Sequence, residues 1–242
     1  MAFFKKFREA QRPRCTALVA AAGSSTRMGG INKLLQPLDG TPVLIRTLTA
    51  LQQARRVDEI VVAAREEDLV EISRLCRTYG ISKCAKVVRG GESRVHSVLL
   101  AALEAREDAE LLAVQDGARP LVTPELIDAV AEAAARTGAA APAVPVKDTV
   151  KTVRGDGTVA ETLNRDILRA VQTPQIFESS LLKAALQAAV EGGIPVTDDC
   201  SAVERLGKRV YLVEGDEENL KITTPVDLLL AEAILERRED PV

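Results

Sequence analysis

The stretch ALVAAAGSSTRMGGINK, residues 17–33, joins the end of an apolar run to a loop of small residues. Its first half is apolar throughout, which is typical of a strand buried on both faces of a sheet. Arg27 and Lys33 are its only charged residues. Small residues let a backbone approach a polyphosphate, and Arg and Lys commonly bind phosphate oxygens. We therefore predict a phosphate-binding loop after the first strand.

Two familiar nucleotide-binding patterns do not match this loop. The dinucleotide pattern G-x-G-x-x-G fails because Gly23 is followed by Ser24, Ser25 and Thr26, and the next glycine is Gly29. The Walker pattern fails because the chain contains no Gly-Lys-Ser or Gly-Lys-Thr. An ordinary strand-to-helix connection with incidental charges stays open as an alternative.

Apolar runs alternate with amphipathic patterns along the rest of the chain. The predicted strands are 16–21, 58–64, 84–88, 110–115, 139–146 and 208–213. The predicted helices are 42–54, 66–79, 92–105, 123–137, 179–191 and 224–238. This alternation predicts a three-layer α/β fold, with a mostly parallel sheet and helices on both faces.

Short sequence signals mark where several helices begin and end. Thr41-Pro42, Thr123-Pro124 and Thr224-Pro225 each offer a threonine N-cap followed by a proline at the first helical position. Gly80 and Gly138 follow two predicted helices, at positions where a positive φ ends a helix.

Residues 147–172 interrupt the alternation with β-branched runs around Gly155-Asp156-Gly157, which predicts a projecting β-hairpin arm. Such an arm has little core of its own and is most stable against a second subunit. We therefore predict a homodimer, with a surface flap on a monomer as the alternative. We assign residues 15–242 to one domain that includes the arm, and residues 1–14 to a frayed tail.

Composition limits the partners of the chain. Its 242 residues carry a net charge of −3 and only 2% aromatics, which disfavours nucleic-acid binding. No apolar run reaches the roughly 18 residues of a membrane span. Cys15, Cys76, Cys84 and Cys200 form no CxxC pair and have no histidine near them in sequence, which disfavours a zinc site. With no signal peptide pattern, we expect a cytoplasmic location.

Several motifs occur together in order along the chain: AAGSSTRMGGINKLLQPLDGTPVLIRTL, VRGGESRVHS, VQDGARPLV, VPVKDTVK, RAVQTPQIF, TDDCSAVERLG and NLKITTPVDLLLAEAIL. This series resembles the family of 2-C-methyl-D-erythritol 4-phosphate cytidylyltransferases from about residue 16 to residue 236. The resemblance implies a Rossmann-like nucleotidyltransferase fold. It also implies transfer of CMP from CTP to the polyol phosphate, with release of pyrophosphate, in isoprenoid precursor biosynthesis. Mg²⁺, held mainly through the CTP phosphates, and a homodimer whose arm reaches the partner's site are implied as well.

The resemblance also implies roles for individual residues. Arg27 and Lys33 would stabilise charge on the triphosphate, and Arg165 and Lys221 would position the acceptor phosphate. The nucleotide-binding positions would be Ala20, Ala21, Ala22, Gly23, Ser25, Gly91, Glu92, Ser97, Asp116 and Gly117. The acceptor-binding positions would include Arg119, Thr149, Thr173 and Thr197. Asp116 could touch either the metal or a sugar hydroxyl.

Other interpretations stay open at this stage. A ribitol 5-phosphate cytidylyltransferase shares the loop, TPQ and TDD features. A nucleotide-binding oxidoreductase and a non-catalytic nucleotide-binding module are rivals from other classes. We interpret His96 as a packing or surface residue and Cys200 as a small buried thiol. Asp198 and Asp199 fit either a paired-carboxylate site or a helix N-terminus.

Overall fold

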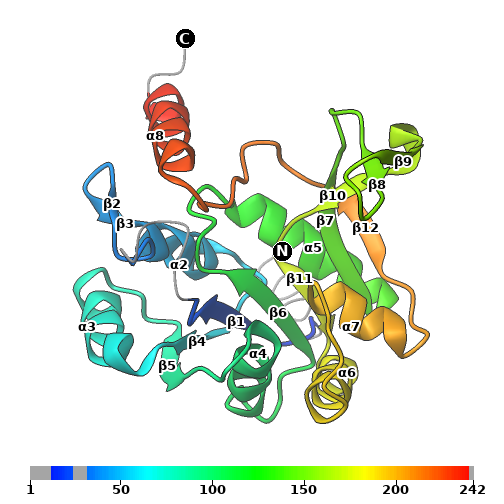
Figure 1. Ribbon diagram of the computed structural model, residues 1–242. Helices are drawn as coiled ribbons and strands as arrows, with labels where there is room; N and C mark the ends of the chain where they lie inside the picture. The colour runs from blue at the N-terminus through cyan, green and yellow to red at the C-terminus, as the bar shows by residue number, and fades with distance from the viewer. Residues whose placement is uncertain (1–11, 24–31, 240–242) are drawn as a thin grey trace, which may run out of the picture.

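A mixed, mostly parallel sheet runs through the molecule (Figure 1). The computed structural model describes residues 12–23 and 32–239. Four neighbouring parallel strands are β5 (Cys84–Arg89), β4 (Glu59–Ala64), β1 (Cys15–Ala21) and β6 (Leu111–Asp116). The sheet continues through β11 (Gln175–Glu178), β7 (Ala139–Pro145), β10 (Arg169–Val171) and β12 (Tyr211–Glu214). Only β10 and β11 run antiparallel to their neighbours, so the predicted sheet is confirmed.

Helices cover both faces of this sheet, as the alternation predicted. One apolar core lies under α2 (Val43–Gln53), α3 (Leu69–Thr78), α5 (Pro124–Thr137) and α8 (Pro225–Glu239). The other lies under α4 (Arg94–Leu103), α6 (Ser179–Glu191) and α7 (Asp199–Arg205). A short 3₁₀ turn, Glu66–Asp68, precedes α3. The two cores lie on opposite faces of the same sheet, which agrees with one domain; the assignment of residues 15–242 to one domain stays a prediction.

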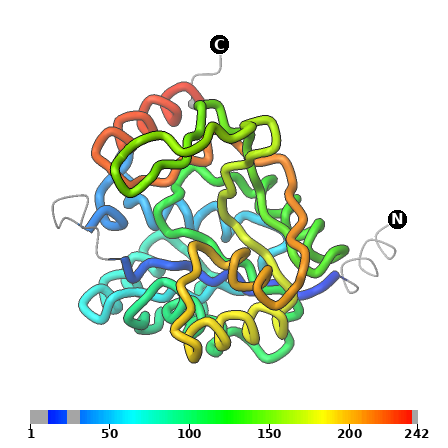
Figure 2. The backbone as a smooth tube through the Cα atoms, turned by 45° about the vertical axis from the view of Figure 1, so that its right-hand side comes forward, coloured from blue at the N-terminus to red at the C-terminus, as the bar shows by residue number. Residues whose placement is uncertain are grey.

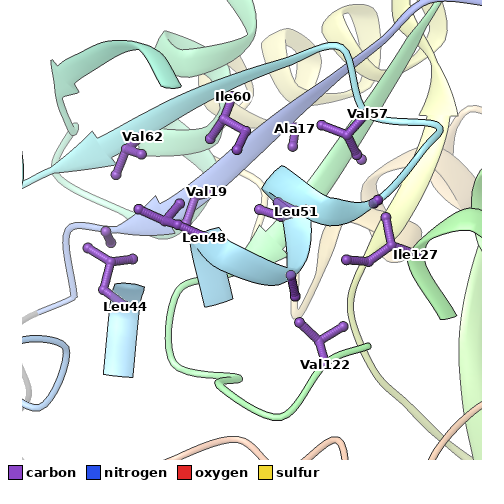
Figure 3. Packing of buried hydrophobic residues seen from close by; sticks show 14 of the residues in the cluster. Ala17, Val19, Leu44, Leu48, Leu51, Val57, Ile60, Val62, Val122 and Ile127 are labelled. Carbon is purple, nitrogen blue, oxygen red and sulfur yellow. The ribbon is translucent and has the colours of Figure 1, made fainter. Parts of the chain in front are cut away.

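The central strand β1 is buried on both faces because its side chains alternate between the two cores. Ala17 and Val19 belong to the first core, whereas Leu18 belongs to the second. Figure 3 shows Leu48 and Leu51 of α2 beside Val19. An apolar run without alternation is thus what this position requires.

The helix starts follow the predicted signals in part. Thr123 caps α5 by accepting the N–H of Leu126, and Pro124 is the first helical residue. Pro225 begins α8, and Gly80 and Gly138 have the expected positive φ.

The prediction for Thr41-Pro42 is wrong. These two residues form β3, which pairs with β2 (Pro37–Leu38), and α2 begins at Val43 without a side-chain cap. Backbone carbonyls replace the cap: Val43 N–H donates to Gln36 and Leu44 N–H donates to Leu34.

The predicted hairpin arm exists but is shorter than 147–172. β8 (Lys151–Val153) and β9 (Val159–Thr162) pair antiparallel in a separate two-stranded sheet. Residues 169–171, which the sequence prediction assigns to the arm, form β10 of the main sheet. In both views the hairpin and α8 lie at the top of the molecule and α6 lies at the bottom (Figures 1 and 2). Among the described residues, no helix is long and apolar enough to cross a membrane.

The chain is anchored before residue 15, contrary to the predicted tail 1–14. Arg12 makes two hydrogen bonds with Asp58, with Nη2 2.6 Å and Nη1 3.0 Å from the carboxylate oxygens. Asp58 also accepts the N–H of Cys15 at 2.9 Å. Burial opposes the charge on Asp58, but these two donors outweigh it and lower its pKa. The rest of the predicted tail, residues 1–11, lies outside the described residues.

We expect Asp58→Asn to lower the free energy of unfolding by about 1 to 3 kcal/mol at neutral pH, because a charge-assisted contact is lost. The folded pKa of Asp58 lies below its ordinary 3.8, so this stabilisation is complete well above pH 3.8. It is lost as the pH falls through the folded pKa. Urea unfolding from pH 8 down to pH 3 measures the difference between the two proteins.

The matched control is Asp108→Asn, which removes an exposed partner of Arg106 and should change stability little. A destabilisation by Asp58→Asn that grows as the pH falls would contradict the assigned role.

Candidate functional site

A cavity of about 430 Å³ opens at the carboxyl ends of the parallel strands. The register of β1 with β6 sets Ala20 opposite Asp116, and Gly117 N–H donates to Ala20 O at 3.1 Å. Ile222 N–H donates to Ala118 O, which fastens the chain before α8 onto the same edge. Segments from distant parts of the sequence therefore meet where open α/β sheets bind ligands.

The wall formed by residues 90–97 depends on two glycines in close contact with their surroundings. A Cβ on Gly90 would lie 2.5 Å from Ala22 Cβ, and one on Gly91 would lie 2.3 Å from His96 Cγ. Ser97 Oγ accepts the N–H of Gly91 at 3.1 Å, and Ser93 caps α4. Any side chain at either glycine would push this wall out of position.

Asp116 lies at the base of the cavity, surrounded by cations. Its Oδ2 is 2.8 Å from Lys221 Nζ and 3.5 Å from Arg119 Nε, and its Oδ1 is 3.5 Å from Arg94 Nη2. Burial would raise the pKa of Asp116, but Arg94, Lys221 and Arg119 outweigh it and lower the pKa to about 2. The carboxylate is therefore charged at every physiological pH.

Arg94 links Asp116 to a second buried carboxylate. Its Nη1 is 2.8 Å from Oδ2 of Asp199, whose side chain is 1% exposed. Burial opposes the charge on Arg94, but Asp199 and Asp116 outweigh it and raise the pKa of Arg94. Burial raises the pKa of Asp199, and Arg94 only partly offsets this. One guanidinium thus balances two carboxylates at the cavity wall.

Most of the sequence-predicted positions meet in this cavity. Those that line it are Ala20, Ala22, Gly23, Lys33, Gly91, Glu92, Ser97, Asp116, Gly117 and Lys221. Lys33 Nζ also donates to Ile222 O at 2.7 Å. Ser25 and Arg27, and with them the centre of the predicted phosphate loop, lie outside the described residues.

Other predicted positions lie behind or beside the cavity. Ala21 is buried in the first core. Arg119 is buried next to Asp116 and donates to Asn219 O at 2.6 Å; burial lowers its pKa, and Asp116 partly offsets this. Thr173 is buried and accepts the N–H of Asp116 through Oγ1. Thr197 lines a second cavity of about 430 Å³, which shares residues 92–94 with the first.

Thr149 and Arg165 do not line this cavity. Both are exposed, and they flank the β8–β9 hairpin. The Nη1 atom of Arg165 donates instead to Lys147 O at 2.8 Å.

Sequence reasoning missed Arg94 and Thr223 as site residues, and it left Asp199 open between a paired-carboxylate site and a helix N-terminus. Arg94 comes shortly after the paired glycines 90–91 and is the first residue of a helix. A cation that follows small residues is the same signal that predicts a phosphate-binding role for Arg27. Nothing in the sequence pairs Arg94 with Asp199, because they are 105 positions apart and only the fold brings them together.

Three open interpretations are resolved by local contacts. His96 packs against Gly91, as expected of a packing residue. Cys200 is a buried thiol whose pKa burial raises. Asp198 caps α7 by accepting the N–H of Ser201, so the two aspartates are not an exposed carboxylate pair. Among the described residues, no group of three or more acidic, histidine or cysteine side chains could hold a metal ion.

Comparison with known proteins decides the family. A family model described as 2-C-methyl-D-erythritol 4-phosphate cytidylyltransferase matches residues 15–237. The chain belongs to this family. It is therefore a nucleotidyltransferase, and the resemblance drawn from its motifs is confirmed.

Relatives match over nearly their full length. A protein of this name from Bacillus cytotoxicus is 44% identical over 221 residues, which is 91% of this chain and 97% of the relative. One from Halalkalibacterium halodurans is 44% identical over 93% of this chain and 98% of the relative. The crystal structure of 4-diphosphocytidyl-2C-methyl-D-erythritol synthase from Anaerococcus prevotii superimposes with a TM-score of 0.83 at 30% identity, covering 93% of this chain and 97% of that one.

We expect Arg94→Met to destabilise the protein by about 3 kcal/mol, because it leaves Asp199 buried without its cation. Adding Asp199→Asn should recover at least half of that loss, since the buried charge is then removed. Urea unfolding at pH 7 measures both effects. Arg74→Met, which breaks an exposed pair with Glu71, is the control and should have almost no effect. A double variant no more stable than Arg94→Met would contradict the pairing.

Proposed function

We propose that the cavity at the ends of β1 and β6 is where the chain transfers CMP from CTP to 2-C-methyl-D-erythritol 4-phosphate. This is the reaction of the family to which the chain belongs, in isoprenoid biosynthesis. An oxygen of the acceptor phosphate attacks the α-phosphorus of CTP. The bond from that phosphorus to the bridging oxygen breaks, and the electron pair leaves with pyrophosphate.

The observation that carries this assignment is the set of cations around the cavity. Lys33, Arg94 and Lys221 line it, together with the exposed Glu92 and the buried Asp116. The two substrates are both anions at neutral pH and repel each other, so their approach depends on fixed positive charge. The acceptor phosphate is already ionised and needs no general base.

Individual roles follow from position. Lys33, together with Arg27 six positions earlier in the sequence, would stabilise charge on the triphosphate. Lys221 would position the acceptor phosphate, because Asp116 holds its ammonium group at 2.8 Å. The small residues from Ala20 to Gly23, together with the paired glycines 90–91, leave room for the nucleotide against the backbone.

A divalent cation fits this donor set. Mg²⁺ in nucleotide sites typically keeps several waters and uses one or two carboxylates together with phosphate oxygens. Asp116 supplies one such carboxylate, charged because of its low pKa. Bound through the CTP phosphates, the cation would reduce their negative charge. Asp116 would hold it in place, and Lys221 would remain beside the acceptor.

We also propose a homodimer in which the hairpin arm serves the partner's site. Val153, Val159 and Ile167 on the arm are 68%, 51% and 78% exposed, and apolar side chains grouped on a projecting element are typical of a protein–protein interface. Thr149 and Arg165 flank the same hairpin outside their own cavity. A second copy of the chain would cover the apolar surface and receive these two residues.

A reducing compartment agrees with the state of the cysteines. Cys15, Cys76, Cys84 and Cys200 are all free thiols, and we propose a cytoplasmic location.

The function is tested by pyrophosphate release from CTP and Mg²⁺ with each of two acceptors. We expect turnover with 2-C-methyl-D-erythritol 4-phosphate and at least tenfold lower kcat/KM with ribitol 5-phosphate, because a site that hydrogen-bonds the hydroxyls of one polyol leaves polar groups unpaired with another. Equal or better use of ribitol 5-phosphate would refute the proposed substrate. A lack of pyrophosphate with either acceptor would refute the assignment as a whole.

The shared site is tested by mixing two inactive variants. Lys33→Ala and Arg165→Ala should each lower kcat by about 10² to 10³, as expected when one charge-stabilising donor is lost. In a mixed dimer, one site combines the intact Lys33 of one subunit with the intact Arg165 of the other. Co-expression of the two variants should therefore restore about a quarter of wild-type activity, for random pairing in a two-fold symmetric dimer.

The control for this experiment mixes Lys33→Ala with Lys221→Ala, because both residues line the same cavity. That mixture should stay inactive. Activity in the control, or none in the test mixture despite confirmed mixed dimers, would contradict the contribution of the arm to the partner's site.

A further inference from the structure

A short buried segment, residues 172–175, runs from the end of β10 to the first residue of β11 and contacts three separate parts of the site. Thr173 Oγ1 accepts the N–H of Asp116 at 3.1 Å. Gln172 Nε2 donates to Asp216 O at 2.8 Å, in the stretch that leads to Lys221. Gln175, which is 2% exposed, bonds to the start of α7. No role for either glutamine follows from the chemistry described so far.

Gln175 uses both ends of its amide on the first turn of α7. Its Oε1 accepts the N–H groups of Asp199 and Cys200, both at 3.0 Å. Its Nε2 donates to Oδ2 of Asp198 at 2.9 Å, while Oδ1 of the same aspartate caps the helix through Ser201 N–H. A buried amide engaged in this way fixes the position of the helix start.

The residues fixed by Gln175 border the cavity. Thr197 immediately precedes the helix cap and lines the second cavity, which adjoins the nucleotide cavity through residues 92–94. Asp199 holds Arg94, which lines both cavities. The amide of Gln175 therefore controls a part of the site that its own atoms do not reach.

We propose that Gln175 is a positioning residue for the acceptor: its amide holds Asp198, and with it Thr197, in the place where the polyol phosphate binds. This rests on the proposed function and on the acceptor-binding role that the family resemblance implies for Thr197. A capping role in stability alone would affect both substrates equally, whereas positioning of the 197–198 turn affects the acceptor.

Gln175→Glu changes one atom of the contact. The new carboxylate can still accept the N–H groups of Asp199 and Cys200, so Arg94 keeps its partner. Its other oxygen replaces a donor with an acceptor facing Asp198 Oδ2, and the two repel. We expect KM for the acceptor to rise about tenfold, equivalent to about 1.4 kcal/mol, with KM for CTP and kcat within about twofold of wild type.

A second substitution should reverse this effect. In Gln175→Glu combined with Asp198→Asn, the hydrogen bond runs in the opposite direction, from an amide at 198 to a carboxylate at 175. The remaining oxygen at 198 still caps Ser201. KM for the acceptor should return to within about threefold of wild type, a coupling that independent effects would not give.

Gln187→Glu is the matched control. This glutamine lies on the exposed face of α6 and donates to Glu191. The same substitution there should leave both KM values unchanged.

The proposal is overturned if Gln175→Glu leaves KM for the acceptor unchanged, if it raises both KM values equally, or if the folded double variant shows no recovery. If Gln175→Glu fails to fold, the Asp198→Asn variant tests the proposal by itself. It breaks the same hydrogen bond, and because Asp198 is only half-buried, the substitution is easier for the fold to accommodate. An unchanged acceptor KM in that variant also overturns the proposal. Turnover by the wild-type protein is measured first, so a failure of the proposed function is seen separately.

Discussion

The site depends on one buried carboxylate that holds three cations at the edge of the sheet. Asp116 ends β6 and faces Arg94, Arg119 and Lys221, which come from different parts of the chain. Like charges would otherwise drive these side chains apart, and burial would otherwise neutralise the acid. The low pKa of Asp116 is the measure of this mutual stabilisation. Under the proposed function, the cavity would present these positive charges to two anionic substrates, and Asp116 would balance them when no substrate is bound.

Backbone and amide contacts hold the segments around Asp116, in addition to the ion pair between Arg94 and Asp199. Gly90 and Gly91 pack too closely against Ala22 and His96 to admit a side chain. Gln172, Thr173 and Gln175 tie the end of β6, the stretch before Lys221 and the start of α7 to one another. Contacts that fix the side chains around the cavity suit a reaction that needs no covalent intermediate, because the rate of such a reaction depends on how well two phosphates are aligned.

Prediction from sequence succeeded where the signal was local and strong. Long apolar runs gave the six predicted strands, and glycines 80 and 138 ended their helices as expected. It failed where tertiary contacts replaced a local signal. At Thr41-Pro42 the backbone of residues 34–36 satisfies the first helical N–H groups, so the threonine cap is not used. The strand β11 was missed because its four residues include only two apolar ones, Ile176 and Phe177, and so form no apolar run.

The sequence by itself determined the alternating α/β architecture, the family and most of the residues that line the cavity, because periodicity and ordered motifs are properties of neighbouring residues. Only the tertiary structure decided that Arg94 lies between Asp116 and Asp199, and that Gln175 reaches the start of α7. Those contacts join residues 22 to 105 positions apart, and no local pattern encodes them. Their strength comes from burial, since charges and amides removed from water depend on the partners that the fold supplies.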